Sequence, residues 1–364
     1  MIPRPKKFSN SLIFWLFVSL LLTIVILING ISIFPSSSYQ RLSQYPFITR
    51  TDIGKENYWQ QDILLPIISF FAKWNTPLKF NTFCFVIIIA AYLLFAGLIF
   101  NRFGFKLGII CTTILITSSI TTVLLTWIGS TDCLTFALTI PILFTSSYFL
   151  IFFLALFGVT NHIIFLIASI EILLLRWISK DKIKIIHIFL AIMGGAIGYG
   201  IVNAFLAFNH IHVYSKFDFI VSKGLNGWVG KNMMNLPLTI FSLLNIQWLL
   251  ILICLIMFFK KDKLYYSSVV ALLILNYFIS FFTLDTTRIF SLISWGILLE
   301  VIFHSYQLSM SDEKDPLIQK RFIQALVIIG VLSFISPRYF SWEGNIYNTN
   351  FSTFIFRIFG GCKK

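Results

Sequence analysis

Long apolar segments follow one another along almost the whole chain, and only short polar stretches separate them. Most approach the length of about 20 residues that a helix needs to cross a lipid bilayer. The segments lie at 12–35, 81–100, 107–128, 134–145, 148–158, 162–176, 186–206, 237–259, 265–283, 289–308 and 322–336. This pattern predicts an all-α, polytopic integral membrane protein with about eleven transmembrane or half-membrane helices. We expect one transmembrane domain over residues 1–364.

The fourth and fifth segments, 134–145 and 148–158, are too short to span a bilayer alone. They predict either a hairpin of half-helices or one bent helix, broken near Pro141 or at 145–147. We count both as crossings because every tight basic loop then falls on one side, as the positive-inside rule requires. That side holds Lys6, Lys7, Arg102, Lys106, Arg176, Lys180, Lys182, Lys184, Lys260, Lys261, Lys263, Lys320 and Arg321. The expected location is the cell inner (plasma) membrane, with a cytoplasmic N-terminus.

Composition agrees with the membrane assignment. Hydrophobic residues make up 58% of the chain and charged residues 12%, against about 25% charged residues in soluble domains. The net charge of +14 suits cytoplasmic loops beside anionic headgroups, and no basic soluble segment points to nucleic acid. The five cysteines form no Cys-x-x-Cys pair, so neither a disulfide framework nor a zinc site is indicated.

The other connections are expected outside the cell, including two long loops at 36–80 and 207–236 and a C-terminal tail at 337–364. In the first loop, the apolar stretch Ile63–Trp74 predicts a short helix at the membrane interface. Carboxylates in this loop can act as a general base or hold a divalent metal, while aromatic rings can face a sugar. A plain solvated loop is the alternative. The candidate residues are Arg50, Asp52, Glu56 and Asp62, interspersed with Tyr58 and Trp59.

Further ionisable residues occupy tight turns on the same expected side. They are Asp132, His162, Asp285 and Arg288. The three-residue spacing puts Asp285 and Arg288 on one helix face. Three of them have an ordinary alternative: Asp285 as a helix N-cap, Asp132 as a turn or cap residue, and His162 as an interfacial residue. Ionisable groups at membrane depth mark functional sites, and all four residues are expected to project to the same face.

Two more acids, Glu171 and Glu300, lie toward the expected cytoplasmic ends of their helices. Their spacing allows local pairs with Arg176 and His304, and we expect the carboxylates to reach the interface. A proton or ion path is the alternative. The run Gly194–Gly200 inside an apolar segment predicts close helix packing.

The layout resembles the GT-C superfamily of membrane glycosyltransferases and the related surface-polysaccharide polymerases. The matching pieces are the loop with Asp52, Glu56 and Asp62, the Ile63–Trp74 stretch, and the short segments at 134–158. The run Arg50-Thr-Asp52-Ile-Gly54, followed by Tyr58, is also similar to an early pattern in some polymerases.

The resemblance implies glycosyl transfer from a polyprenyl-phosphate-linked sugar at the outer membrane face, with a membrane lipid as partner. Asp52 or Asp62 would be the catalytic base, and Arg288 with Arg50 or Lys55 would stabilise the departing phosphate. The remaining substrate-binding residues would be Glu56, Asp132, His162 and Asp285. The cofactor is unknown, and a divalent metal is compatible with the acids.

Two other classes of function stay open. A transporter or flippase would place polar residues at mid-membrane and use broken helices. A non-catalytic membrane assembly subunit would keep its function when the outer acids are neutralised.

Overall fold

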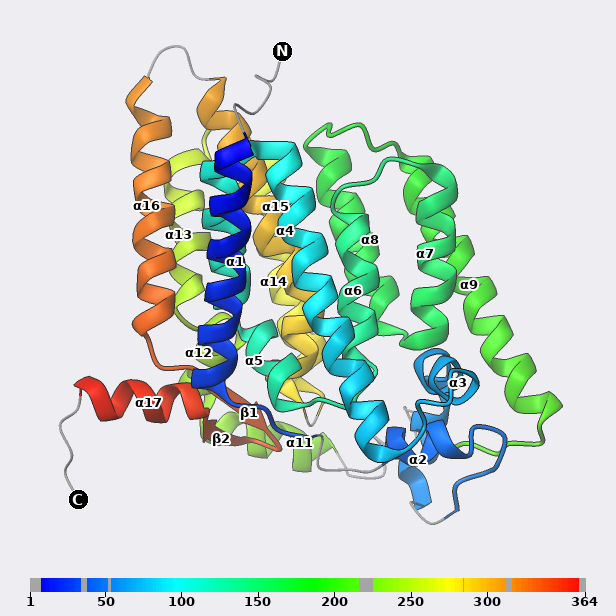
Figure 1. Ribbon diagram of the computed structural model, residues 1–364. Coiled ribbons are helices and arrows are strands. Elements are labelled where there is room, and N and C mark those ends of the chain that lie inside the picture. The colour runs from blue at the N-terminus through cyan, green and yellow to red at the C-terminus, as the bar shows by residue number, and fades with distance from the viewer. Residues whose placement is uncertain are drawn as a thin grey trace.

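The computed structural model describes residues 8–33, 38–51, 54–215, 225–283, 285–311 and 316–359, apart from the side chains of 8–9, 54–56, 225–229, 316 and 355–359. Nearly all of it is helical, and the long helices run side by side in one bundle (Figure 1). Lys6, Lys7 and Asp52 lie outside the described residues, as do the side chains of Lys55 and Glu56.

Seven of the described helical stretches are long and apolar enough to cross a membrane. They are α1 (Phe8–Asn29), α4 (Pro77–Ile116), α9 (Ile185–Phe208), α12 with α13 (Leu236–Leu244 and Trp248–Phe258), α14 (Lys263–Phe281), α15 (Thr286–Met310) and α16 (Pro316–Ile335). Shorter helices lie among them: α5 (Ser119–Thr126), α6 (Asp132–Ile142), α7 (Tyr148–Asn161) and α8 (Ile164–Ile178). The chain is therefore a multi-pass helical membrane protein, as its hydropathy predicts.

One end of the bundle carries most of the structure that does not cross it (Figure 1). These elements are α2 (Ser38–Gln44), the 3-10 helix η1 (Gly54–Gln61), α3 (Leu64–Phe71), α11 (Leu225–Met234), β1 (Tyr339–Trp342), β2 (Asn345–Asn348) and α17 (Asn350–Phe359). We call this the hairpin end, after the β1–β2 pair, and the other the opposite end. The helix predicted at Ile63–Trp74 is present as the shorter α3.

The β-hairpin departs from the all-α prediction. Its strands are antiparallel, and Trp342 pairs with Asn345 across a two-residue turn. The turn residues Glu343 and Gly344 have φ of 51° and 74°, the left-handed conformation that a type I′ hairpin turn requires. The hairpin is too short for the two-residue alternation of a strand to stand out in the sequence.

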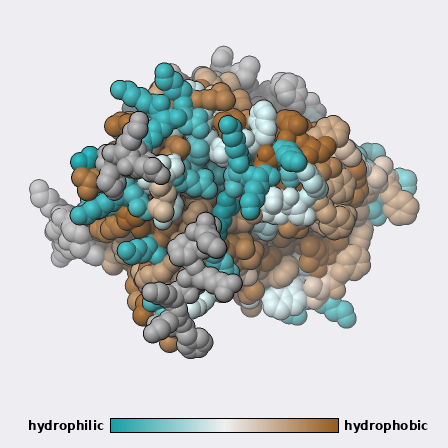
Figure 2. Space-filling model, turned by 90° about the horizontal axis from the view of Figure 1, so that it is seen from above, coloured by the Kyte–Doolittle hydropathy of each residue, from teal (hydrophilic) through white to brown (hydrophobic). Residues whose placement is uncertain are grey.

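Basic side chains gather at the opposite end. Arg102 and Arg176 both donate to Asp181 Oδ2, at 2.8 and 3.1 Å, which ties three chain segments together there. Seen from this end, hydrophilic residues gather above a largely hydrophobic flank (Figure 2). The exposed basic residues are Lys106, Lys180, Lys182, Lys184, Lys260, Lys261, Lys263, Lys320 and Arg321. The predicted sorting of basic loops to one side agrees with this arrangement.

Helix α15 forms the centre of the bundle. Of its most apolar stretch, 94% is buried inside the protein, against 28–44% for the other six candidate spans. Protein rather than lipid therefore surrounds α15 on all faces. A helix in that position can carry polar and charged side chains that would be costly against hydrocarbon.

Two crossings are interrupted, and the interruptions meet. The segment Thr117–Ser118 separates α4 from α5, and Asn245–Gln247 separates α12 from α13. Ser119 Oγ donates to the Leu243 carbonyl, and Gln247 Nε2 donates to the Ile114 carbonyl, both at 2.7 Å. Each break thus supplies hydrogen bonds to backbone groups that the other leaves unpaired, as broken helices at membrane depth require.

The short segments predicted at 134–145 and 148–158 form two separate antiparallel helices, α6 and α7, rather than one bent helix. Helix α6 has only 11 residues, or about 17 Å of rise. At its C-terminal end, Arg176 Nη1 donates to the Ile142 carbonyl at 2.6 Å and to the Thr145 carbonyl at 2.7 Å. A guanidinium there satisfies carbonyls that have no partner within the helix.

The predicted glycine packing is confirmed between α7 and α9. A Cβ added at Gly198 would lie 2.5 Å from the Leu156 carbonyl oxygen, and Gly194 makes a similar approach to the Phe152 carbonyl. The four-residue spacing is that of a small-residue helix interface. Backbone contact between the two helices leaves no room for a side chain.

We predict that Gly198→Ala destabilises the protein by about 1–3 kcal/mol because the added methyl group must push α9 from α7. Gly200→Ala is the matched control, since a Cβ there meets nothing within 4 Å. Unfolding in mixed micelles measures both variants. Equal stability would contradict the proposed α7–α9 contact.

Candidate functional site

A buried ion pair between Arg288 and Asp132 lies at the hairpin end. Arg288 lies in the first turn of α15, and Asp132 is the first residue of α6. The guanidinium binds the carboxylate in bidentate geometry, with Nε to Oδ2 at 2.5 Å and Nη2 to Oδ1 at 2.9 Å. The Trp127 ring lies 4.9 Å from the guanidinium carbon, close enough for a cation–π contact. The pair fixes the starts of two helices that are 156 residues apart in the chain.

Asp285 extends this pair. Arg288 Nη1 donates to Asp285 Oδ2 at 3.0 Å, which confirms the predicted shared helix face. Asp285 also occupies the N-cap position of α15, as the alternative interpretation expected, but its carboxylate binds Arg288 and makes no side-chain cap hydrogen bond. Asp132 likewise pairs with Arg288, and it follows the N-cap residue Thr131.

Asp285 has the properties of a poised base. Its Oδ1 is buried and has no hydrogen-bond partner, while 20% of the side chain as a whole is exposed. Burial raises the pKa of Asp285 to about 6, although Arg288 acts in the opposite direction. A carboxylate with a pKa near the working pH can both accept and release a proton.

Asp62 forms a second centre beside the ion pair. Its Oδ2 accepts a hydrogen bond from the Tyr39 hydroxyl at 2.8 Å and lies 3.8 Å from His162 Nε2. His162 Nδ1 accepts from the Ile164 amide at 3.2 Å, which assigns the ring proton to Nε2, on the side of Asp62. The imidazole therefore presents a donor to this carboxylate.

Tyr39 connects the two centres. Burial raises the pKa of the Tyr39 hydroxyl, and the charges of Asp62, Arg288 and Asp132 all act on it. Its ring stacks on Trp59 at 5.7 Å. The hydroxyl thus stays protonated between an accepting carboxylate and the buried ion pair.

The structure brings five predicted site residues together: Asp62, Asp132, His162, Asp285 and Arg288. Arg50 is buried in the first loop, where its amide donates to Gln60 Oε1 at 2.8 Å. Asp52 and the Glu56 side chain lie outside the described part of the chain. Of the two residues predicted as the catalytic base, Asp52 and Asp62, the structure therefore describes only Asp62.

Three residues of the site were not predicted. They are Tyr39, Trp127 and Asn161. Asn161 Nδ2 donates to the Thr131 carbonyl at 2.9 Å and to Thr135 Oγ1 at 3.0 Å, and so holds the start of α6 in place. An asparagine before His162 in an apolar stretch was a usable signal, whereas nothing in the sequence distinguishes Tyr39 or Trp127.

The site is negatively charged, and Arg288 is fully engaged. Three carboxylates (Asp62, Asp132 and Asp285) face one guanidinium, whose three nitrogens all donate to Asp132 or Asp285. The expectation that Arg288 stabilises a departing phosphate does not fit this geometry. Among the described residues, no group of three His, Cys, Asp or Glu side chains could hold a metal ion.

A separate polar cluster lies deeper, around Glu171. Its Oε2 accepts from Asn276 Nδ2 at 2.8 Å, and the same nitrogen donates to Ser294 Oγ at 3.0 Å. Glu171 and Glu300 are each 3% exposed, so neither reaches the interface as expected. The predicted local pairs are also wrong.

The basic partners of those two acids bind other residues. Arg176 binds Asp181, and His304 Nε2 lies 3.0 Å from Asp262 Oδ2. Asp181 and Asp262 belong to loops at the opposite end, where part of each side chain is exposed. Glu171 and Glu300 are therefore left inside the bundle without a basic partner from their own helix.

No protein-family model, curated protein or solved structure matches this chain. Its function is therefore argued from the geometry of its own residues.

We predict that Asp132→Asn destabilises the protein by about 3–5 kcal/mol, since it leaves the buried Arg288 guanidinium short of a counter-charge. Asp262→Asn is the control because its partly exposed pair with His304 is worth about 1 kcal/mol or less. Denaturant or mixed-micelle unfolding gives both values. If Asp132→Asn lowers the free energy of unfolding no more than Asp262→Asn does, the ion pair has no structural role.

Proposed function

We propose that the protein is a membrane-embedded glycosyltransferase that acts at the extracytoplasmic face on polyprenyl-phosphate-linked sugars for surface glycan assembly. The proposal includes a GT-C-like arrangement with eleven crossings. The observation that carries it is Asp285, a carboxylate with a raised pKa whose side chain is 20% exposed and whose buried Oδ1 has no partner, beside a polar site.

The proposed orientation follows from the distribution of charge. Nine exposed lysines and arginines lie at the opposite end, among them Lys180, Lys260 and Lys320, against Arg41, Lys73, Lys79 and Lys231 at the hairpin end. Because loops rich in positive charge face the cytoplasm, we propose that the hairpin end lies outside the cell and the N-terminus inside it. In a plasma membrane, the site around Arg288 then faces the side on which surface glycans are assembled.

In the proposed reaction, Asp285 removes the proton from an acceptor hydroxyl. The hydroxyl oxygen attacks the anomeric carbon of the donor sugar, and the lipid phosphate leaves with the electron pair of the broken C–O bond. Arg288 holds Asp285 in place, so it acts as a positioning residue. Tyr58 and Trp59 offer aromatic faces to a sugar ring. Asp62, hydrogen-bonded to Tyr39, is the second candidate for the base.

Turnover of a polyprenyl-phosphate sugar by the purified protein in lipid tests this proposal. We expect Asp285→Asn or Asp62→Asn to lower the rate by about 10²–10⁴-fold, the usual contribution of a general base. Asp262→Asn, at the opposite end, should retain the wild-type rate. If both site variants also keep full turnover, neither carboxylate is the base.

The pH dependence gives an independent check. Because burial raises the pKa of Asp285 to about 6, the base is protonated below that pH, and kcat/KM should rise as pH increases through 6. The residual activity of Asp285→Asn should lack this acid limb. An unchanged acid limb in the variant would assign the titration to another group.

Transport is a second candidate, favoured by the polar interior. The breaks at Thr117–Ser118 and Asn245–Gln247 meet inside the bundle, and elsewhere in the interior Glu171 Oε1 has no hydrogen-bond partner. Discontinuous helices around a buried carboxylate are typical of transporter sites. A flippase would lose lipid flux in Glu171→Gln but tolerate Asp285→Asn, whereas the proposed transferase should show the reverse. A non-catalytic assembly subunit would tolerate both.

A further inference from the structure

Glu171 holds a carboxyl group inside the bundle, at the place where α8 meets α14 and α15. The residue and its neighbours Asn276 and Ser294 are at most 3% exposed. Asn276 Nδ2 donates to Glu171 Oε2 at 2.8 Å and to Ser294 Oγ at 3.0 Å. The carboxamide of α14 therefore links α8 to the central helix α15.

Two oxygen atoms of this cluster have no hydrogen-bond partner. They are Glu171 Oε1 and Asn276 Oδ1, and both are buried. Each is the second atom of a planar group whose other atom takes part in the hydrogen bond between the two residues. Both oxygens are acceptors, and Asn276 Nδ2 has already used its two hydrogens. Because buried polar atoms are nearly always bonded, the cluster lacks a donor for these two acceptors.

No positive charge compensates Glu171. The described helices that pack on α8 are α6, α7, α9, α14 and α15. Apart from tyrosines and cysteines, their ionisable side chains are Asp132, His187, Lys263, Arg288, Glu300 and His304. None of these groups, and no other ionisable side chain among the described residues, acts on Glu171. Arg176, in the same helix, binds Asp181 instead.

Glu300 shows how an equally buried carboxyl group is treated elsewhere in the bundle. It is also 3% exposed, but the positive charges of Arg176 and Arg102 act on it through space. Nearby positive charges favour an ionised carboxylate. At Glu171, a negative charge would have only one amide hydrogen bond to offset its burial, and an isolated buried charge is very costly. This position therefore suits a neutral carboxyl group.

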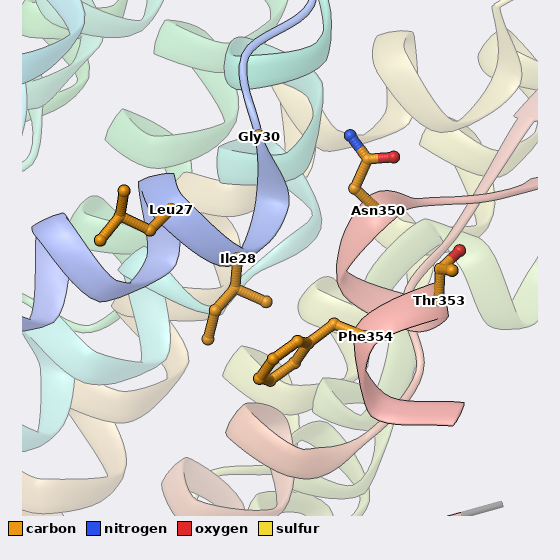
Figure 3. Close-up of a pocket in the computed structure, with 6 residues that line it drawn as sticks. All are labelled: Leu27, Ile28, Gly30, Asn350, Thr353 and Phe354. Atoms are coloured by element: carbon orange, nitrogen blue, oxygen red, sulfur yellow. The ribbon is translucent and has the colours of Figure 1, made fainter. Parts of the chain in front are cut away.

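An open groove at the hairpin end gives the opposite case. It lies between the end of α1 and α17 and is lined by Leu27, Ile28, Gly30, Asn350, Thr353 and Phe354 (Figure 3). Asn350 and Thr353, on the α17 wall, are exposed, so water can bond their polar atoms. The unpaired oxygens of Glu171 and Asn276 are buried, and only a donor bound inside the bundle can satisfy them.

We propose that Glu171 is a proton-binding site, in which the proton bonds to Oε1 and is donated to Asn276 Oδ1. The proton takes a lone pair of Oε1 and leaves the carboxyl group neutral. Both unpaired oxygens then have partners, and two hydrogen bonds hold α8 to α14. Loss of the proton leaves a charge without a partner, which favours separation of α8 from α14 and entry of water.

A proton reaches such a site without a permanent channel. Buried carboxyl groups titrate in folded proteins, and local opening admits solvent to the interior. The inference rests on the Glu171–Asn276 cluster and does not depend on glycosyl transfer. Proton binding can therefore be demonstrated even if transfer is absent.

Infrared spectroscopy of the full chain in phosphatidylcholine nanodiscs tests the proposal, because a protonated carboxyl group and a carboxylate absorb at different frequencies. Wild type, Glu171→Gln and the matched control Glu300→Gln are compared at neutral pH in choline chloride. We expect Glu171→Gln to lose a protonated-carboxyl band that Glu300→Gln retains. Asn276→Leu should shift this band because the acceptor of the proton is gone.

Unfolding gives a second readout. Glutamine has the shape of protonated glutamate, and its amide nitrogen can donate to Asn276 Oδ1, so Glu171→Gln should melt at no lower temperature than the wild type. A lower melting temperature, or an unchanged protonated-carboxyl signal in Glu171→Gln, would overturn the proposal. A band that disappears when sodium chloride replaces choline chloride at the same pH would overturn the proton as the ligand, in favour of a sodium ion.

Discussion

The ion pair between Arg288 and Asp132 is the interaction on which the organisation of this protein depends. Charges inside a membrane protein need both a partner and a protein environment. The partner comes from the start of α6, and the environment comes from the central position of α15, which is 94% buried along its apolar stretch. Asp285, Tyr39 and Asp62 lie around the contact between these two helices.

The sequence predicted those features that depend only on the charge and hydropathy of individual residues. Basic loops predicted which ends of the helices lie together, and the acids and His162 in tight turns were expected to project to the other face. The three-residue spacing also predicted the contact of Asp285 with Arg288. These predictions succeed because the side of the membrane on which a residue lies depends on the solvation free energy of that residue itself.

Long-range packing could not be predicted from the sequence. Nothing in α15 distinguishes a helix at the centre of the bundle from one at its surface, so Glu300 was expected to reach the interface. Asp285 fits an N-cap by residue type, but a guanidinium one turn away competes for its carboxylate. The burial of Arg338, which is 1% exposed, could not be predicted either, because an arginine after an apolar segment usually faces water.

Arg288 neutralises and orients the acids of the site, Asp132 and Asp285. The central claim is that Arg288 and Asp132 are directly coupled, and a double-mutant cycle of Asp132→Asn and Arg288→Gln tests it most directly. We predict a coupling free energy of unfolding of about 1.5–3 kcal/mol, as expected for contacting charged groups. Additive losses within about 0.5 kcal/mol would contradict the pair and the site built on it.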